Sequence, residues 1–258
     1  MKIAALALGA LALAAPSAQA ETRLNGAGAS FPAPIYQKWF SDYATQTGNE
    51  VNYQAIGSGA GVRQYKAGTT DFGASDKAVS DKKLAGISRK MVQIPMTGGA
   101  IAVAYNKPGC DLKLSQVELT KVFYGRIDNW SQLGCAAGPI TVAVRSDGSG
   151  TTAGFTNSLS AFSPYWEARV GRGKSVKWPA AGTVGGKGNS GVAGVIKNNE
   201  GAIGYLNYGY VVGGKFQQAA VQNRAGNYVK ASGETSAAGL AQIVLDDKLR
   251  GTDANPAG

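Results

Sequence analysis

The residues best suited to chemistry form a turn near the middle of the chain. The stretch RSDGSGT, residues 145–151, follows the apolar, β-prone run at 140–144 and precedes a helix that we expect over 153–161. Free backbone N–H groups at a helix N-terminus, hydroxyl donors and an arginine fork together form a receptor for an anion. The chain has no histidine, so this turn suits anion binding better than hydrolysis.

Two earlier turns share the same design, in which a strand is followed by small residues with a hydroxyl and then by a helix. They are GASF at 28–31, which contains Ser30 and Phe31, and GSG at 57–59, which contains Ser58. Any one of them could be ordinary helix capping. The carboxyl ends of the strands in an open α/β sheet form the ligand crevice, so we expect the three turns to converge there.

Asp76 follows the strand expected over 71–74 and decides which anion fits. A carboxylate repels an anion unless the ligand brings a proton. Inorganic phosphate near neutral pH still carries one O–H, which Asp76 can accept in a charge-assisted hydrogen bond worth about 1.5–3 kcal/mol. Sulfate has no such proton, so the same carboxylate disfavours it. The plainer alternative is that Asp76 only caps the strand end.

Known nucleotide-binding and hydrolase motifs are incomplete at these turns. A P-loop needs Gly-Lys-Ser/Thr, whereas Gly150 is followed by Thr151. A nucleophile elbow needs G-x-S-x-G and a histidine base. The dinucleotide-type start at Gly26 and Gly28 lacks its third glycine. Catalysis by a Ser–Lys pair stays formally open, but these turns favour a binding protein and not an enzyme.

The first twenty residues have the pattern of a secretory signal peptide. Lys2 supplies the positive charge, residues 3–15 are apolar, and residues 18–20 form an A-x-A cleavage site. We therefore expect cleavage after Ala20 and an exported, soluble mature protein. The residue directly after the cleavage point is Glu21 and not a cysteine, so a lipid anchor is not expected.

The two cysteines, Cys110 and Cys135, both lie beyond the signal peptide. In an oxidising compartment such a pair most simply forms one disulfide. A metal or redox role is disfavoured because the chain has neither histidine nor a C-x-x-C motif. We expect a structural disulfide, and neither a metal nor a cofactor.

The net charge points to anionic partners. The formal charge of +10 becomes +9 when Lys2 leaves with the signal peptide. A positive field favours anions and raises their encounter rate. The basic residues are scattered and do not form runs, so nucleic acid is not an expected partner, whereas a small anion is.

Strand and helix signals alternate along the mature chain, which predicts an α/β fold with largely parallel sheets. Residues 92–105 suggest two extended segments with a break near Pro95 and Gly98-Gly99. This break is the candidate crossing between two lobes.

Two helices carry recognisable patterns. Ser115 and Glu118 form a capping box for a helix that reaches Phe123. Leu240, together with the apolar residues at 243–244, marks a last amphipathic helix near the end of the chain.

Several blocks of the sequence, in the same order, resemble the periplasmic phosphate-binding proteins that feed ABC-type phosphate importers. The blocks are GAGASFPAP at 26–34, YQAIGS at 53–58, DFGASD at 71–76, RSDGSGT at 145–151, VKWP at 176–179 and GAIGY at 201–205. The resemblance covers nearly the whole mature chain. It implies an α/β receptor with the two-lobed periplasmic-binding-protein fold, type II-like, that closes on dehydrated phosphate.

The resemblance also implies a role for each site residue. Asp76 would accept the phosphate proton, and Arg145, steered by Asp147, would donate to phosphate oxygens. The remaining donors would be the hydroxyl of Ser30, the backbone N–H of Phe31, the hydroxyl and N–H of Ser58, and the helix start at Ser149, Gly150 and Thr151.

The domain division that we expect is a signal peptide at 1–20, a first lobe at 21–95 and a second lobe at 96–258. Members of the resembled family usually continue further and return to the first lobe to finish its sheet. The expectation here is that this return is missing or truncated, which leaves the first lobe incomplete. Exposed sheet edges would then favour aggregation.

The favoured function is that of a monomeric periplasmic receptor without catalytic activity. It would bind inorganic phosphate with high affinity, close through a hinge near residues 95–99, and deliver phosphate to the membrane permease of an ABC importer. Three alternatives stay open. They are a receptor for another oxyanion such as sulfate, phosphonate or arsenate, a secreted phosphatase-like enzyme, and a basic surface adhesin that keeps the motifs only as scaffold.

Overall fold

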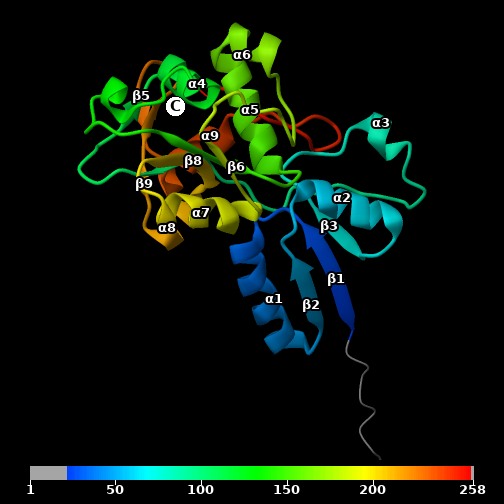
Figure 1. Ribbon diagram of the computed structural model, residues 1–258. Coiled ribbons are helices and arrows are strands. Elements are labelled where there is room, and N and C mark those ends of the chain that lie inside the picture. Colours follow the sequence, from blue (N-terminus) through cyan, green and yellow to red (C-terminus); the bar gives the residue numbers. More distant parts are fainter. Residues whose placement is uncertain (1–21, 257–258) are drawn as a thin grey trace, which may run out of the picture.

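The computed structural model describes residues 22–256, which form two lobes joined by a strap without helix or strand, residues 87–100 (Figure 1). The expected signal peptide at 1–20 lies outside the described residues. Within the described part, no helix is long and apolar enough to cross a membrane.

The N-terminal lobe is built on a parallel three-stranded sheet of order β2-β1-β3. Its elements, in chain order, are β1 (Arg23–Gly28), α1 (Ala33–Thr47), β2 (Glu50–Gln54), α2 (Ser58–Ala67), β3 (Phe72–Ala74) and α3 (Asp81–Leu84). Helix α1 packs on the sheet through aromatic rings. Tyr36 meets Tyr53 edge-on at 5.2 Å between ring centroids, and Tyr53 stacks on Phe72 at 6.1 Å.

Two glycines bring the ends of this sheet together. Gly28 has a φ of +152°, and a Cβ there would lie 2.1 Å from the carbonyl oxygen of Ala74 on β3. A Cβ on Gly61 of α2 would lie 2.4 Å from the Cα of Gly28. Because both positions lack side chains, α2 and β3 approach β1 closely, and the turns that follow β2 and β3 lie next to each other.

The large lobe contains a five-stranded sheet of order β7-β6-β8-β4-β9 and a small sheet of order β11-β10-β5. Its elements are β4 (Ile101–Asn106), β5 (Lys113–Leu114), α4 (Gln116–Tyr124), the 3₁₀ turn η1 (Trp130–Leu133), β6 (Thr141–Arg145), α5 (Gly150–Phe162), α6 (Pro164–Arg169), β7 (Thr183–Gly186), α7 (Gly188–Asn198), β8 (Ala202–Asn207), α8 (Tyr208–Gly214), β9 (Gln217–Gln218), β10 (Ala220–Gln222), β11 (Tyr228–Val229) and α9 (Gly233–Ala241).

The five-stranded sheet is covered on both faces, with α7 on one side and α4 and α5 on the other (Figure 1). Strand β8 is buried along its whole length, as expected for a central strand. Its side chains alternate between faces. Ile203 and Tyr205 belong to the core that contains the α5 residue Leu159, whereas Leu206 belongs to the core under α7.

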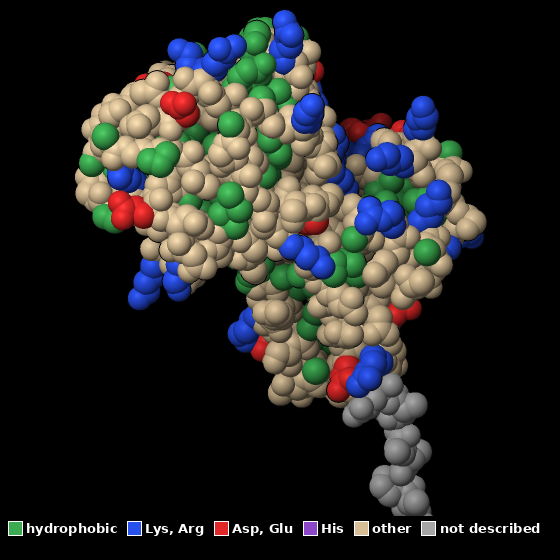
Figure 2. Space-filling model, in the orientation of Figure 1, with side chains coloured by type: hydrophobic (Ala, Val, Ile, Leu, Met, Phe, Trp, Pro, Cys, Tyr) green, Lys and Arg blue, Asp and Glu red, His purple; other side chains and the backbone are tan. Residues whose placement is uncertain are grey.

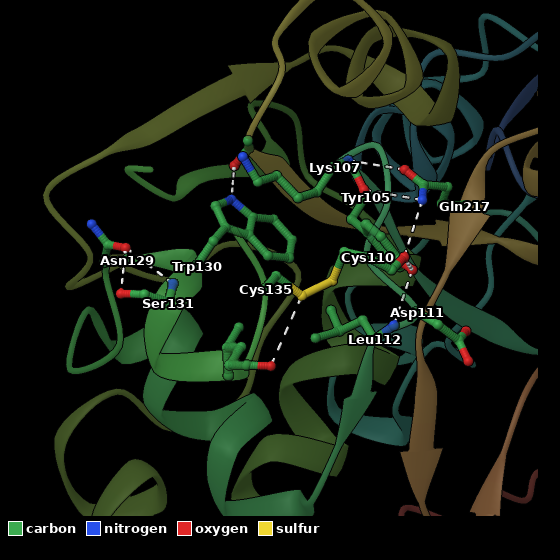
Figure 3. Close-up of a disulfide and its surroundings, with 12 residues drawn as sticks. Tyr105, Lys107, Cys110, Asp111, Leu112, Asn129, Trp130, Ser131, Cys135 and Gln217 are labelled. Carbon is green, nitrogen blue, oxygen red and sulfur yellow. Dashed lines mark hydrogen bonds between the residues drawn. A yellow bond between two sulfur atoms is a disulfide. The ribbon is translucent and has the colours of Figure 1, made fainter. Parts of the chain in front are cut away.

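The expected disulfide between Cys110 and Cys135 is confirmed, and it brackets α4 and η1 (Figure 3). The two Cα atoms are 5.5 Å apart, with 25 residues of sequence separation. On the chain-entropy model a loop of this length contributes about 3.5 kcal/mol of stability. Next to it, the Tyr105 hydroxyl donates to the carbonyl of Cys110 at 2.7 Å and accepts from the N–H of Leu112 at 3.1 Å.

The α/β prediction is confirmed, with corrections to individual elements. Strand pairing is parallel throughout the N-terminal lobe and between β6 and its neighbours, but β4 runs antiparallel to β8 and β9. The first extended segment expected within 92–105 forms no strand, since the regular structure begins at Ile101. The last helix, α9, ends at Ala241, so residues 243–244 lie beyond it.

Helix starts also differ from expectation. The capping box of Ser115 and Glu118 is present at the start of α4. Helix α5 begins at Gly150, three residues before the expected start at 153, and α2 begins at Ser58, within the GSG turn at 57–59 that was expected to precede the helix. Both shifts place the chemically interesting residues in the first helical turn.

The segment that follows α9, residues 242–256, lies against the strap and the N-terminal lobe. Arg250 donates to Asp81 of α3 at 3.0 Å. Exposed apolar side chains of the strap and this segment, among them Val92 and Ile94, line a cavity of about 1040 Å³ that reaches the junction of the lobes.

Candidate functional site

The N-terminus of α5 is the centre of the site. Strand β6 ends at Arg145, and the turn 146–149 leads into the helix. Ser149 is the N-cap: its hydroxyl accepts from the N–H of Thr152 at 2.9 Å, and its own N–H donates to the carbonyl of Lys174 at 2.8 Å. Both hydrogen bonds of Ser149 lie within the large lobe and hold the turn in place. The N–H of Gly150 and the side chain of Thr151 point to the N-terminal lobe.

Arg145 and Asp147 form a buried ion pair beside this helix start. Arg145 Nε and Nη2 lie 2.7 and 2.5 Å from the two carboxylate oxygens of Asp147, and the two side chains are only 1% and 13% exposed. Burial alone would raise the pKa of Asp147, but hydrogen bonds from Arg145 and from the N–H of Gly188 (2.9 Å) hold it below its ordinary value. The remaining nitrogen, Arg145 Nη1, lies 3.4 Å from the hydroxyl of Thr151 and so faces the site.

The N-terminal lobe contributes Ser58 and Asp76 from the first turn of α2 and the end of β3. The Ser58 hydroxyl donates to Asp76 Oδ1 at 3.0 Å and accepts from the N–H of Gly150 at 3.2 Å. A Cβ on Gly150 would lie 2.5 Å from both the Ser58 oxygen and the Asp76 carboxyl carbon. Only glycine at this position allows the α5 terminus to come so close to the other lobe.

Asp76 is a buried carboxyl among hydroxyl groups. Burial raises its pKa above the ordinary value, although hydrogen bonds with Ser58 and Thr151 and the nearby charge of Arg145 oppose the shift. The Thr151 hydroxyl lies 3.0 Å from Asp76 Oδ2 and 2.9 Å from Asn207 Oδ1. This hydroxyl has one proton and faces two acceptors, so it can donate to only one of them at a time.

Ser30 and Phe31 are the remaining residues that the N-terminal lobe contributes to the site. The Ser30 hydroxyl accepts from the backbone N–H of Asn189 at 3.1 Å and from its side-chain amide at 2.9 Å. Phe31 lines the same cavity as Asp76 and Gly150. The carbonyl of Ser30 accepts from the hydroxyl of Tyr210 at 2.7 Å, which adds a further contact between the lobes.

Two buried asparagines belong to the site although sequence reasoning did not single them out. Asn189 in the first turn of α7 is fully buried, and Asn207 at the end of β8 is 4% exposed. The Asn189 side-chain amide donates to Asn207 Oδ1 at 2.9 Å, and the N–H of Asn207 donates back to Asn189 Oδ1 at 3.0 Å. The glycine-rich stretch at 185–194 was the available signal, since it too leads from a strand to a helix.

All nine residues expected at the site lie at the junction of the two lobes. A continuous chain of hydrogen bonds crosses it, from Ser30 through Asn189, Asn207, Thr151, Asp76 and Ser58 to the N–H of Gly150. Among residues 22–256, no group of three or more acidic or cysteine side chains is placed to hold a metal ion. The arrangement offers hydroxyl, amide and guanidinium donors around one protonatable carboxyl, which suits an oxyanion that carries a proton.

Several known proteins are similar to this chain. A family model described as a PBP superfamily domain matches residues 14–256. The chain is 45% identical over 235 residues to the phosphate-binding protein PstS of Pasteurella multocida, a match that covers 86% of this chain and 67% of that protein. It is 44% identical over 246 residues to PstS of Haemophilus influenzae, with 90% and 72% covered.

A solved structure is similar over most of its length. The chain superposes on a high-affinity periplasmic phosphate-binding protein (PfluDING) bound with phosphate, with a TM-score of 0.71 and 25% identity, covering 87% of this chain and 69% of that one. The chain thus spans between 67% and 72% of the lengths of these three relatives.

Proposed function

This chain belongs to the PBP superfamily and, within it, to the phosphate-binding proteins PstS, and we propose from that premise that it binds inorganic phosphate where its two lobes meet. The identities of 45% and 44% to two such proteins support the ligand. So does the phosphate in the similar solved structure.

The observation that carries the proposal is the environment of Asp76. Its carboxyl is buried between hydroxyl donors, and burial raises its pKa, so it holds a proton more readily than an exposed aspartate. A ligand O–H is the partner such a carboxylate accepts, and phosphate near neutral pH has one. The N–H of Gly150 and the guanidinium of Arg145 then serve the unprotonated oxygens.

The donors that face the ligand are already ordered in this structure, because they hydrogen-bond one another across the junction. A bound phosphate would replace these bonds. Micromolar affinity requires about 8 kcal/mol. A set of four charge-assisted hydrogen bonds, each worth about 1.5–3 kcal/mol, is sufficient in magnitude, and lobe closure and ligand desolvation reduce the net value.

The proposed role is transport and not catalysis. The chain would act as a monomeric periplasmic receptor, closed by a hinge near residues 95–99 of the strap between lobes at 21–95 and 96–258, and would deliver phosphate to an ABC permease. Ser30, Ser58 and Thr151 of the site are buried and hydrogen-bonded to neighbouring side chains, in a chain without histidine, which supports this role over a phosphatase.

Equilibrium dialysis of the ligand-stripped chain against radiolabelled phosphate tests the proposal. We expect one bound phosphate per chain, which unlabelled phosphate and arsenate displace because both carry a proton at neutral pH. Equal displacement by sulfate would contradict the role of Asp76, and absence of retained label would contradict phosphate binding. Steady release of phosphate from a phosphomonoester by the pure protein would favour the phosphatase alternative.

A further inference from the structure

Lys174 lies behind the site in the loop between α6 and β7. Its backbone carbonyl accepts the N–H of Ser149, the N-cap of α5, at 2.8 Å. The position of this lysine is therefore fixed relative to the helix terminus that faces the ligand.

The side chain of Lys174 crosses from the large lobe to the N-terminal lobe. Its ammonium group donates to the hydroxyl of Ser75 at 2.8 Å. Ser75 directly precedes Asp76, and its own hydroxyl donates to the carbonyl of Lys77 at 2.6 Å, which fixes the direction of the oxygen that Lys174 contacts. The bond ties the α5 N-cap to the residue next to the proton-accepting carboxyl.

This bond differs from the contacts between the lobes inside the site. The pairs Ser58–Gly150 and Thr151–Asp76 use groups that a bound phosphate would engage. The Lys174–Ser75 bond uses none of them, so it can persist when the ligand is bound. It also has a charged donor, and such hydrogen bonds are about twice as strong as neutral ones.

Burial and nearby charges together determine the pKa of Lys174. Asp76 lies near it and favours the ammonium form, whereas Lys77 and Lys83 on the same side disfavour it. Burial is the largest influence, and together these effects lower the pKa of Lys174 to about 8. Figure 2 shows Lys and Arg side chains on both sides of the notch between the lobes.

We propose that Lys174 is a latch between the lobes, which holds them together over the bound anion through Ser75 and slows its release. The inference rests on the proposed function, because the latch acts on the phosphate-bound closed form. Lys174 is a positioning residue in this role and does not contact the ligand.

The test is a chase experiment on the full chain loaded with radiolabelled phosphate, in which unlabelled phosphate is added and the dissociation rate is followed. We expect Lys174→Gln and Ser75→Ala each to raise the dissociation rate about tenfold, the effect of one charge-assisted hydrogen bond that is partly exposed. The double variant should be no faster than either single variant, because both remove the same bond. Lys177→Gln, in the same loop but exposed, is the matched control and should release at the wild-type rate.

A pH series separates a latch from a merely structural role. The wild-type dissociation rate should rise between pH 7 and pH 9 as the Lys174 ammonium group loses its proton, and Lys174→Gln should show no such rise. A dissociation rate of Lys174→Gln within twofold of wild type, or additive effects in the double variant, would overturn the latch. If Lys174→Gln failed to fold, Ser75→Ala and the wild-type pH series would still decide the matter. Failure of the wild-type chain to retain label would instead contradict phosphate binding itself, and the latch with it.

Discussion

In the proposed function, the cost of burying the Asp76 carboxyl is coupled to the recognition of a ligand proton. Burial raises the pKa of this group while Ser58, Thr151 and Arg145 moderate the shift. The carboxyl therefore binds a proton more tightly in the folded chain than in the unfolded chain. Without ligand, that preference lowers stability at neutral pH, and a protonated ligand removes the conflict.

The sign of the resulting pH dependence follows from proton linkage. The folded state binds more protons than the unfolded state between the ordinary aspartate pKa of 3.8 and the raised value, so the free energy of unfolding falls as pH rises through this window. The ligand-free Asp76→Asn variant should melt above wild type at pH 7.5, by about 3 °C for each kcal/mol removed. The two should converge near pH 4.

Thermal melts monitored by circular dichroism at both pH values measure this difference. Asp42→Asn is the control, because its carboxylate forms an exposed pair with Lys38 at 2.6 Å. It should change the melting temperature by less than about 1 °C at either pH. A difference between Asp76→Asn and wild type that does not grow with pH would show that Asp76 holds no raised pKa.

At the scale of elements, the approach of α5 to the N-terminal lobe determines the geometry of the site. The helix can bring its free N–H groups to the junction because Gly150 has no side chain. Gly28 and Gly61 have the same effect within the N-terminal lobe, where they bring α2 and β3 to β1.

Gly150→Ala should therefore weaken phosphate binding without unfolding the chain. The new methyl group would overlap Ser58 and Asp76, and overpacking of this kind costs about 1–3 kcal/mol, or about a fivefold to 150-fold loss of affinity. Gly194→Ala in α7 is the matched control, because no atom lies within 4 Å of its added Cβ. Calorimetric titration with phosphate measures both variants, and wild-type affinity in Gly150→Ala would contradict the close approach of α5.

The sequence was informative about the turns and less so about the tertiary contacts they make. Ser58, Asp76 and Gly150 could be predicted because strand–turn–helix junctions have local signatures of glycine, hydroxyl residues and apolar runs. Asn207 could not, because an asparagine at the end of a strand looks like an ordinary cap until its neighbours are known.

The contact made by Lys174 could not be predicted from the sequence either. It lies in a loop with other basic residues, and nothing in its local sequence shows that it reaches Ser75, 99 residues away. The antiparallel direction of β4 was missed for a related reason. Alternating strand and helix signals predict parallel connections, whereas β4 follows a strap without a helix and pairs antiparallel with β8.

At the scale of the whole molecule, the net positive charge is expected to attract anions to the cleft between the lobes. The formal charge of the whole chain is +10, and basic side chains flank the notch between the lobes (Figure 2). Such a field steers small anions toward the cleft over a distance set by the Debye length, which is about 30 Å at 0.01 M salt and about 8 Å at 0.15 M.

The association rate of phosphate should therefore fall several-fold when the ionic strength rises from about 0.01 to about 0.15 M. Rapid-mixing measurements with sodium chloride as the added salt follow this change. The dissociation rate should change less, since it depends on buried hydrogen bonds that salt screens weakly. An association rate that does not depend on salt would show that the surface charge plays no part in capture.

The central claim is that Asp76 selects phosphate by accepting its proton, and paired titrations of wild type and Asp76→Asn with phosphate and with sulfate test it most directly. In calorimetry the ligand-stripped wild type should bind one phosphate tightly and give no heat with sulfate. Asp76→Asn should lose at least about tenfold in phosphate affinity, as expected for one charge-assisted hydrogen bond, and should gain measurable sulfate binding. An unchanged preference for phosphate over sulfate in Asp76→Asn would contradict the account.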